Sequence, residues 1–204
     1  MTNFFPVPYR LNVYMKRLLL SPLSASICVV IILILLISPV SGQDDTIRIL
    51  IDTKALTLKV MQGDQEEVTF SDIAIGRYGA DINRQRGDNK TPLGHFTIDW
   101  ITDDTPFHRF FGFRYPSREY AERAFKAGYL DKKTWNMIRW ALAAGRLPPQ
   151  DTILGGYLGI HGIGNGDKKI HEQYNWTNGC VALTNEQIDR LTAWIRVGTP
   201  VEIR

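Results

Sequence analysis

The chain has 204 residues, 44% of them hydrophobic and 22% charged, which is the ordinary balance of a globular protein. Its 24 basic and 21 acidic residues give a net charge of +3, and Arg10, Lys16 and Arg17 are the only charged residues before position 43. The rest of the chain is therefore neutral. This excludes a nucleic-acid-binding domain, which needs a basic patch to neutralise phosphates.

An uncharged apolar run, residues 18–40, directly follows the basic pair Lys16-Arg17. A basic segment, an apolar segment and then small residues are the parts of a signal peptide, so residues 1–42 are predicted to be one, with cleavage after Gly42. Met15 begins a compact signal of this kind and is a candidate initiator. About 160 residues then remain, enough for one domain with a hydrophobic core.

The same run is also long enough to stay in place as a membrane anchor, because about 20 apolar residues span a bilayer. The basic flank would then remain on the cytoplasmic side of the inner membrane and the domain would face outward. Both alternatives predict export of residues 43–204. Cys28 lies within the run behind Ile27, a poor match to a lipoprotein site, and is interpreted as a plain apolar residue.

Residues 47–75 predict β-structure. Apolar and polar residues alternate in IRILID and again in ALTLKVMQ, and Gly63-Asp64 supplies a turn before a third run. Residues 76–94 are rich in Gly, Asp and Asn and predict a loop. A strand is expected next, over HFTIDWI.

A helical insertion is predicted over about residues 104–150. It begins with an aromatic-rich segment whose expected role is core packing. Two helices should follow. Ser117 can cap the first, which stops at Gly128, and Asp131 can cap the second, which stops at Gly145.

The remainder predicts two strands, a loop and one late helix. Residues 152–161 are an apolar run that favours a strand, and residues 162–179 are a largely polar loop. Thr184 and Gln187 have capping-box spacing before a helix, and a short strand over PVEIR ends the chain. The predicted fold class is mainly β with a helical insertion and one late helix, α+β overall.

The candidate catalytic residues lie in two segments, IHG (160–162) and WTNGC (176–180). If the N-terminal segment is removed, Cys180 has no disulfide partner, and an unpaired thiol in an exported protein needs an explanation. His161 ends an apolar strand and is placed to act as its base. A helix that begins a few residues later is expected to lower the thiol pKa. From these residues alone, an inert buried cysteine and a structural histidine stay open.

The two motifs resemble those of the L,D-transpeptidase catalytic domain family, the YkuD-like proteins. The family pattern is His-Gly, a loop, then Ser or Thr, a variable residue, Gly-Cys and an aliphatic residue. The segment GDNKTPLGHFTI (87–98) matches a further K-TP-G element of that family. The resemblance covers about residues 46–204. Within the family, the chain is similar to a branch with a WTxGC motif and a helical insertion. The resemblance implies a β-sandwich-like catalytic fold.

The resemblance also implies roles for individual residues. Cys180 would be the nucleophile and His161 the general base. The Gly162 carbonyl would orient the imidazole, the amides of Gly179 and Cys180 would form the oxyanion hole, and Thr177 would support the cysteine loop.

Thr177, Trp176, Asn178 and His171 are expected beside the substrate. Many family members have His where this chain has Asn178, and Arg where it has Ala182. Because that Arg is linked to binding an anionic substrate group, carboxylate recognition is placed in doubt. His171 is expected on the surface of a polar loop. A three-ligand zinc site of His171, His161 and Cys180 is a further alternative, but no HExxH or paired-Cys spacing supports one.

The implied reaction is acyl transfer on peptidoglycan tetrapeptide stems, of the diaminopimelate type, in the periplasm or cell envelope, without a metal or organic cofactor. The acceptor stays open: an amine of a second stem or of an envelope lipoprotein, or water, as in a carboxypeptidase or amidase. The alternatives are a non-catalytic peptidoglycan-binding module of the same fold and, less favoured, a metal-dependent peptidase.

Overall fold

The computed structural model describes residues 46–204, so the apolar run 18–40 and the expected cleavage site after Gly42 lie outside the described residues. Within residues 46–204, no helix has both the length and the apolar character needed to cross a bilayer.

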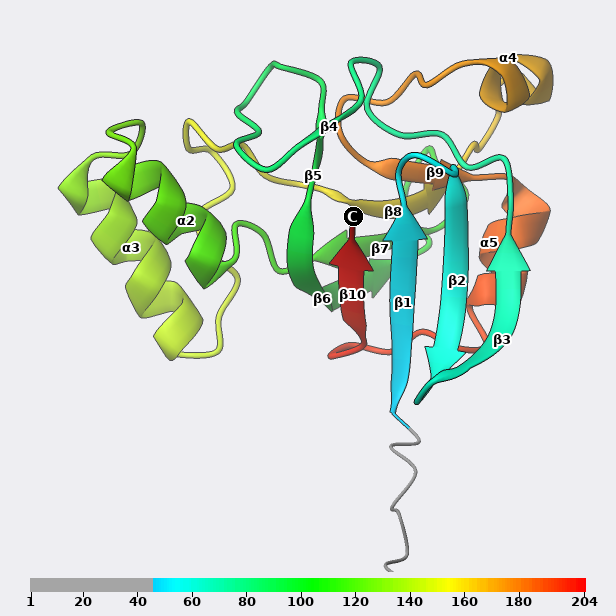
Figure 1. Cartoon of the computed structure of the whole chain (residues 1–204), viewed down its shortest axis with the longest axis horizontal. Coiled ribbons are helices and arrows are strands. Elements are labelled where there is room, and N and C mark those ends of the chain that lie inside the picture. The colour runs from blue at the N-terminus through cyan, green and yellow to red at the C-terminus, as the bar shows by residue number, and fades with distance from the viewer. Residues whose placement is uncertain (1–45) are drawn as a thin grey trace, which may run out of the picture. The chain divides into compact units, whose positions relative to one another are not determined.

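An eight-stranded sheet carries the fold, with strand order β3-β2-β1-β10-β6-β7-β8-β9 (Figure 1). Two pairs are parallel, β1 with β10 and β8 with β9, and the other neighbours are antiparallel. A separate two-stranded ribbon pairs β4 with β5. The strands are β1 (Ile47–Asp52), β2 (Thr57–Gln62), β3 (Gln65–Phe70), β4 (Ala80–Asp81), β5 (Thr91–Pro92), β6 (Gly94–Thr102), β7 (Phe110–Phe113), β8 (Gly159–Gly162), β9 (Val181–Leu183) and β10 (Pro200–Ile203).

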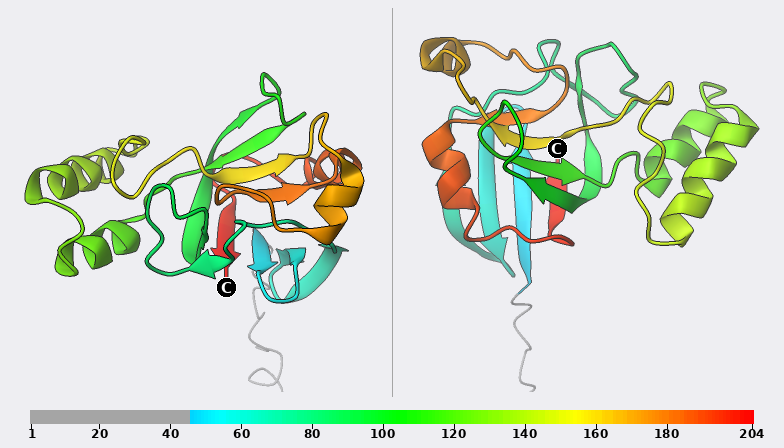
Figure 2. Two further views of the ribbon diagram at one scale, coloured as in Figure 1. Left: turned by 90° about the horizontal axis from the view of Figure 1, so that it is seen from above. Right: turned by 180° about the vertical axis from the view of Figure 1, so that it is seen from behind.

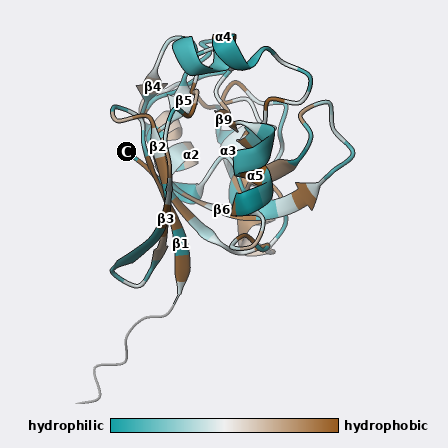
Figure 3. Ribbon diagram, turned by 90° about the vertical axis from the view of Figure 1, so that its right-hand side faces the viewer, coloured by the Kyte–Doolittle hydropathy of each residue, from teal (hydrophilic) through white to brown (hydrophobic). Residues whose placement is uncertain are grey.

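The core follows from the period-two pattern seen in the sequence. Ile49 and Ile51 of β1 are fully buried, as are Leu58 and Val60 of β2. These residues point to one face of the sheet, because side chains two apart share a face of a strand. Figure 3 shows brown and teal residues mixed along the strands, whereas the helices α4 (Lys168–Gln173) and α5 (Asn185–Leu191) are largely teal. The mainly-β fold class is confirmed.

The predicted helix starts are confirmed by their caps. The side chain of Ser117 accepts a hydrogen bond from the amide of Tyr120 at the start of α2 (Arg118–Lys126), and Asp131 accepts one from Thr134 at the start of α3 (Lys132–Ala143). Thr184 and Gln187 form the predicted capping box of α5. Figure 2 shows α2 and α3 standing to one side of the sheet as a helical pair.

The structure differs from the sequence-based elements in several places, beginning with the loop expected over residues 76–94, which contains the short paired strands β4 and β5. The aromatic segment expected within the insertion contains β7, which pairs with β6 and β8 in the main sheet. The strand expected over residues 152–161 begins only at Gly159, because Gly155 and Tyr157 have positive φ angles of 73° and 55° that break an extended backbone. The loop expected over 162–179 contains α4, whose N-cap Asp167 accepts hydrogen bonds from two backbone amides.

Candidate active site

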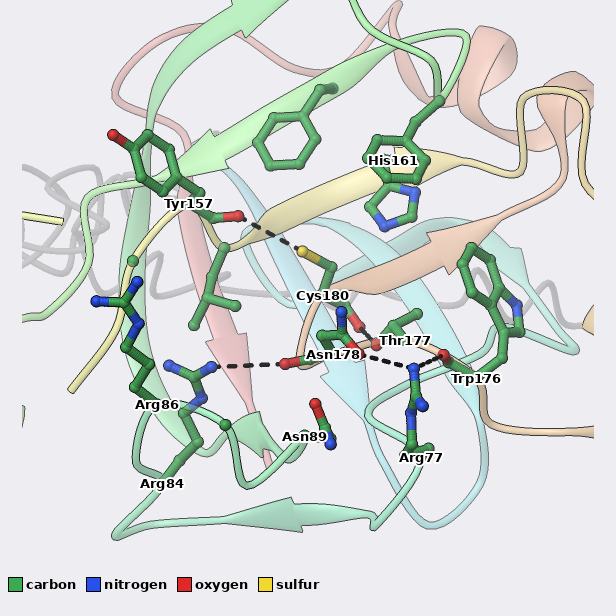
Figure 4. Close-up of a pocket in the computed structure, with 15 residues that line it drawn as sticks. Arg77, Arg84, Arg86, Asn89, Tyr157, His161, Trp176, Thr177, Asn178 and Cys180 are labelled. Atoms are coloured by element: carbon green, nitrogen blue, oxygen red, sulfur yellow. Dashed lines mark hydrogen bonds between the residues drawn. The ribbon is translucent and has the colours of Figure 1, made fainter. Parts of the chain in front are cut away.

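The pairing of β8 with β9 brings the two sequence motifs together. His161 lies opposite Ala182 in this parallel pair, and Cys180 immediately precedes β9. Both side chains line one cavity of about 450 Å³. Figure 4 shows the imidazole and the thiol on the same side of this cavity, with Trp176 and Asn178 beside them. A base and a thiol 19 positions apart in sequence are therefore neighbours in the fold.

His161 is held by its own backbone and by aromatic rings. Its Nδ1 lies 2.7 Å from the carbonyl oxygen of Gly162, which accepts the hydrogen bond, so the proton resides on Nδ1 and Nε2 has the lone pair. The ring of Phe107 lies 4.2 Å away, centroid to centroid, and that of Phe110 stacks at 5.9 Å. Burial lowers the pKa of His161 to about 4, although the Gly162 hydrogen bond acts in the opposite direction. The imidazole is therefore neutral near pH 7 and ready to accept a proton.

The Cys180 thiol is half-buried, and its hydrogen bond goes to the carbonyl oxygen of Tyr157, 3.7 Å from Sγ. Burial raises the pKa of the Cys180 thiol to about 11, while a hydrogen bond from the Gly159 backbone and the charge of Arg84 act to lower it. The expectation of a lowered thiol pKa is thus wrong. The nearby start of α5 does not outweigh the loss of water around the sulfur.

The loop before Cys180 is closed on itself by Thr177. Its Oγ1 donates to the carbonyl of Cys180 at 2.7 Å and accepts from the amide of Gly179 at 3.1 Å. Thr177 is buried, as a supporting residue would be. In this conformation the Gly179 amide, one of the two expected oxyanion donors, is already hydrogen-bonded. Gly179 has φ of 129°, and a Cβ at this position would lie 2.7 Å from the carbonyl oxygen of Lys90.

Of the four residues expected beside the substrate, three line the cavity and one does not. Trp176, Thr177 and Asn178 line it, whereas His171 lies on α4 behind Trp176 and accepts a hydrogen bond from the indole Nε1 at 3.3 Å. The predicted surface position of His171 is wrong, because its side chain is only 3% exposed. Burial lowers the pKa of His171. Trp176 in turn sets its ring edge-on to His161 at 5.8 Å, so His171 supports the site from behind.

Ala182, where many family members have Arg, is fully buried in β9, and its backbone exchanges two hydrogen bonds with Ala74. It contributes no charge to the cavity. Three arginines of the loop predicted over residues 76–94 line the cavity instead: Arg77, Arg84 and Arg86. In the sequence, the only indication that they belong to the site was their concentration in the glycine-containing segment between Gly76 and Asn89.

Arg84 is a buried arginine that joins several parts of the site. Its Nη1 donates to the carbonyl of Leu154 at 2.6 Å, its Nε to that of Lys90 at 3.2 Å, and its Nη2 to that of Asn178 at 3.5 Å. The hydroxyl of Tyr120 in α2 accepts from the Arg84 amide. Arg84 therefore ties the insertion to the cysteine loop.

No metal site involving these residues forms in the described part of the chain, where no three His, Cys, Asp or Glu side chains are grouped to hold an ion. Cys180 and His161 share the cavity, while His171 is turned toward Trp176. His161, His171 and Cys180 are therefore not grouped to hold a zinc ion.

A thiol, a neutral buried imidazole and backbone amides around one cavity are the parts from which a thiol acyl-transfer site is built. The chain belongs to the YkuD family, the L,D-transpeptidase catalytic domain, whose sequence profile matches residues 46–203.

Solved structures share the fold. The helical cell shape determining protein Pgp2 from Campylobacter jejuni matches with 19% identity and a TM-score of 0.54, covering 79% of this chain and 48% of that one. Bd1075 from Bdellovibrio bacteriovorus matches with 18% identity and a TM-score of 0.50, covering 81% and 50%. This chain spans about half the length of either protein, and at these identities the likeness concerns the fold alone. No curated protein matches the chain.

Proposed function

We propose that this protein is a cysteine-dependent acyltransferase that acts on peptidoglycan stem peptides in the cell envelope. The observation that carries the proposal is the shared cavity of Cys180 and His161, in which the imidazole Nδ1 is bound to Gly162 and Nε2 is left as the proton acceptor. The family match supports a substrate of this class.

In the proposed first half-reaction, Cys180 Sγ attacks the carbonyl of the L-centre diamino acid in a tetrapeptide stem. The thiol proton passes to His161 Nε2 as the C–S bond forms, because both groups are neutral in the resting site. The Cys180 amide is the oxyanion donor in this scheme, joined by that of Gly179 if the loop releases it from Thr177. The tetrahedral intermediate then breaks its C–N bond, and His161 returns the proton to the departing D-alanine amine.

The second half-reaction transfers the acyl group from the thioester to an acceptor. An amine of a second stem or of an envelope lipoprotein gives a cross-link, and water gives a shortened stem. In either case His161 removes a proton from the acceptor as it attacks, and Sγ leaves with that proton. We propose that hydrolysis or exchange exceeds cross-linking, since the buried Ala182 supplies no cation to hold an anionic group of the acceptor stem.

We propose that the domain lies outside the cytoplasm and that the apolar run at residues 18–40, outside the described residues, directs its export. A fusion of residues 1–50 to a reporter that works only after export tests this point. An active reporter is expected, and a stable, silent fusion in the cytosol would contradict export.

The decisive test of function is mass spectrometry of disaccharide-tetrapeptides incubated with the purified protein. Loss of D-alanine is expected, with shortened stems in excess of cross-linked dimers. A folded protein that binds the stems but changes none of them would instead favour the non-catalytic binding module. Abundant dimers would contradict only the preference for hydrolysis.

A further inference from the structure

The cavity that holds Cys180 and His161 has an unbalanced charge. Arg77, Arg84 and Arg86 line it, and no Asp or Glu is among its lining residues. All three arginines come from the single connection between Gly76 and Asn89. In Figure 4, Arg77 lies on one side of the cysteine loop, and Arg84 and Arg86 lie on the other. A cavity walled by cations on both sides attracts an anionic ligand.

Arg84 is committed to the protein. It is 4% exposed, each terminal nitrogen donates to a backbone carbonyl, and Nε lies 3.7 Å from Asp88. Its part in the cavity is to fix the loop geometry and to contribute positive potential.

Arg77 and Arg86 are different, because both are exposed: within residues 46–204 Arg77 has no ion-pair partner, and Arg86 has only the exposed Asp151. Arg77 donates to the carbonyl of Trp176 at 3.2 Å and to the side-chain oxygen of Asn178 at 2.7 Å, and both bonds use Nη2. Within residues 46–204 this leaves its Nε and Nη1 for a ligand. Arg86 lies 3.6 Å from Asp151, and both side chains are more than half exposed. Surface pairs of this kind are weak and exchange readily for a better acceptor.

We propose that Arg77 and Arg86 form a carboxylate-binding subsite for an acidic peptide acyl donor, flanking the bond that Cys180 attacks. This inference rests on the proposed function, since it identifies how the same cavity holds its substrate. A planar guanidinium matches a carboxylate through paired N–H donors, which gives orientation as well as affinity. The cations of this subsite come from the segment between β3 and β5, whereas the strand after the cysteine contributes none at Ala182.

Binding and turnover are to be measured separately. The full-length chain with Cys180→Ala is titrated by calorimetry with two probes, disaccharide-tetrapeptide and the same compound with its carboxylates amidated. Arg77→Gln and Arg86→Gln are each expected to weaken binding of the carboxylate form about tenfold, as for lost hydrogen bonds to a charged group. The amidated probe should bind weakly and be insensitive to both substitutions.

Two controls keep the result interpretable. Arg146→Gln removes an exposed arginine of the insertion outside the cavity and should change neither affinity. Arg77→Gln also removes the bond to Asn178, so a distorted loop would weaken both probes equally, whereas Arg86→Gln leaves that bond in place. Thermal unfolding of each variant confirms folding.

The outcomes separate the two proposals. If the parent enzyme processes stem peptides but the Arg77→Gln, Arg86→Gln double variant binds the carboxylate form like the parent, the subsite is wrong and the proposed function stands. If the stem peptide neither binds nor is processed, both are wrong. Selective loss of affinity for the carboxylate form, with Arg146→Gln unchanged, supports the subsite.

Discussion

The thiol of Cys180 is hydrogen-bonded to the backbone carbonyl of Tyr157 at 3.7 Å, and Tyr157 has a φ of 55°, which is uncommon for a residue with a side chain. The resting thiol therefore points to a neutral acceptor that does not take its proton. A thiol with a pKa of about 11 beside an imidazole with a pKa of about 4 makes the thiolate–imidazolium pair a minor state. Proton transfer should thus accompany attack on the substrate.

Alkylation of Cys180 by iodoacetamide should consequently be slow near neutral pH and rise about tenfold per pH unit up to about pH 10, because only the thiolate reacts. The measurement is peptide mass mapping over a pH series, which follows Cys180 separately from Cys28. The unfolded protein is the control and should reach its plateau at lower pH. A plateau near pH 7 in the folded protein would show a stabilised thiolate and contradict this reading.

Cys180→Ala should abolish release of D-alanine and covalent labelling by a carbapenem, because no nucleophile remains. Cys180→Ser should be almost as inactive, since a hydroxyl stays protonated beside this base. Circular dichroism should show the parent fold for both, as the substitutions change little volume. A folded Cys180→Ala protein that releases D-alanine at the parent rate would falsify the mechanism.

His161→Ala should slow acylation by about 10²- to 10⁴-fold, the usual contribution of a general base. The rate is measured from carbapenem acylation by intact mass. The variant leaves a hole between Phe107 and Phe110, so His161→Gln is the matched variant that retains more volume. Acylation of both variants at the parent rate would remove His161 from the chemistry.

His161 should also make stability depend on pH. Its pKa is about 4 in the folded protein against an ordinary value of 6.5, so the unfolded chain takes up the proton first as pH falls. The free energy of unfolding should decrease between about pH 6.5 and pH 4, by up to about 3 kcal/mol. Urea unfolding at several pH values measures it. His161→Gln should flatten the curve in this range, and an identical slope in parent and variant would contradict the assignment.

Gly179→Ala should destabilise the protein by about 1–3 kcal/mol and reduce activity, because the positive φ strains any side chain and the new Cβ meets the Lys90 carbonyl. Gly128→Ala is the matched control, with a φ of 78° but no atom within 4 Å of the new Cβ. This control should lose only the stability that backbone strain costs, and it should retain its activity. Equal loss of activity in both would argue against a local role of Gly179.

His171→Ala should lower the thermal midpoint because it leaves the Trp176 indole without its acceptor and opens a gap under α4. His171→Gln, which offers an acceptor again, should recover part of that loss. Turnover should fall less than in His161→Ala, since His171 does not line the cavity. A loss of turnover as large as that of His161→Ala would place His171 in the reaction itself.

The sequence by itself determined the elements whose causes are local. Alternating apolar residues fix β1 and β2, and a polar side chain with the right spacing fixes the starts of α2, α3 and α5. The motifs around His161 and Cys180 identified the candidate pair and the family, because short strings of specific residue types carry that information without coordinates.

Only the tertiary structure decided the environment of those residues. The pKa values of the thiol and the imidazole depend on how much water the packed chain removes, which no local pattern records. The burial of His171 behind Trp176 has the same origin. The cationic wall also required the fold, since Arg77 and Arg86 reach Cys180 across about 100 positions of sequence, and only β-pairing closes that separation.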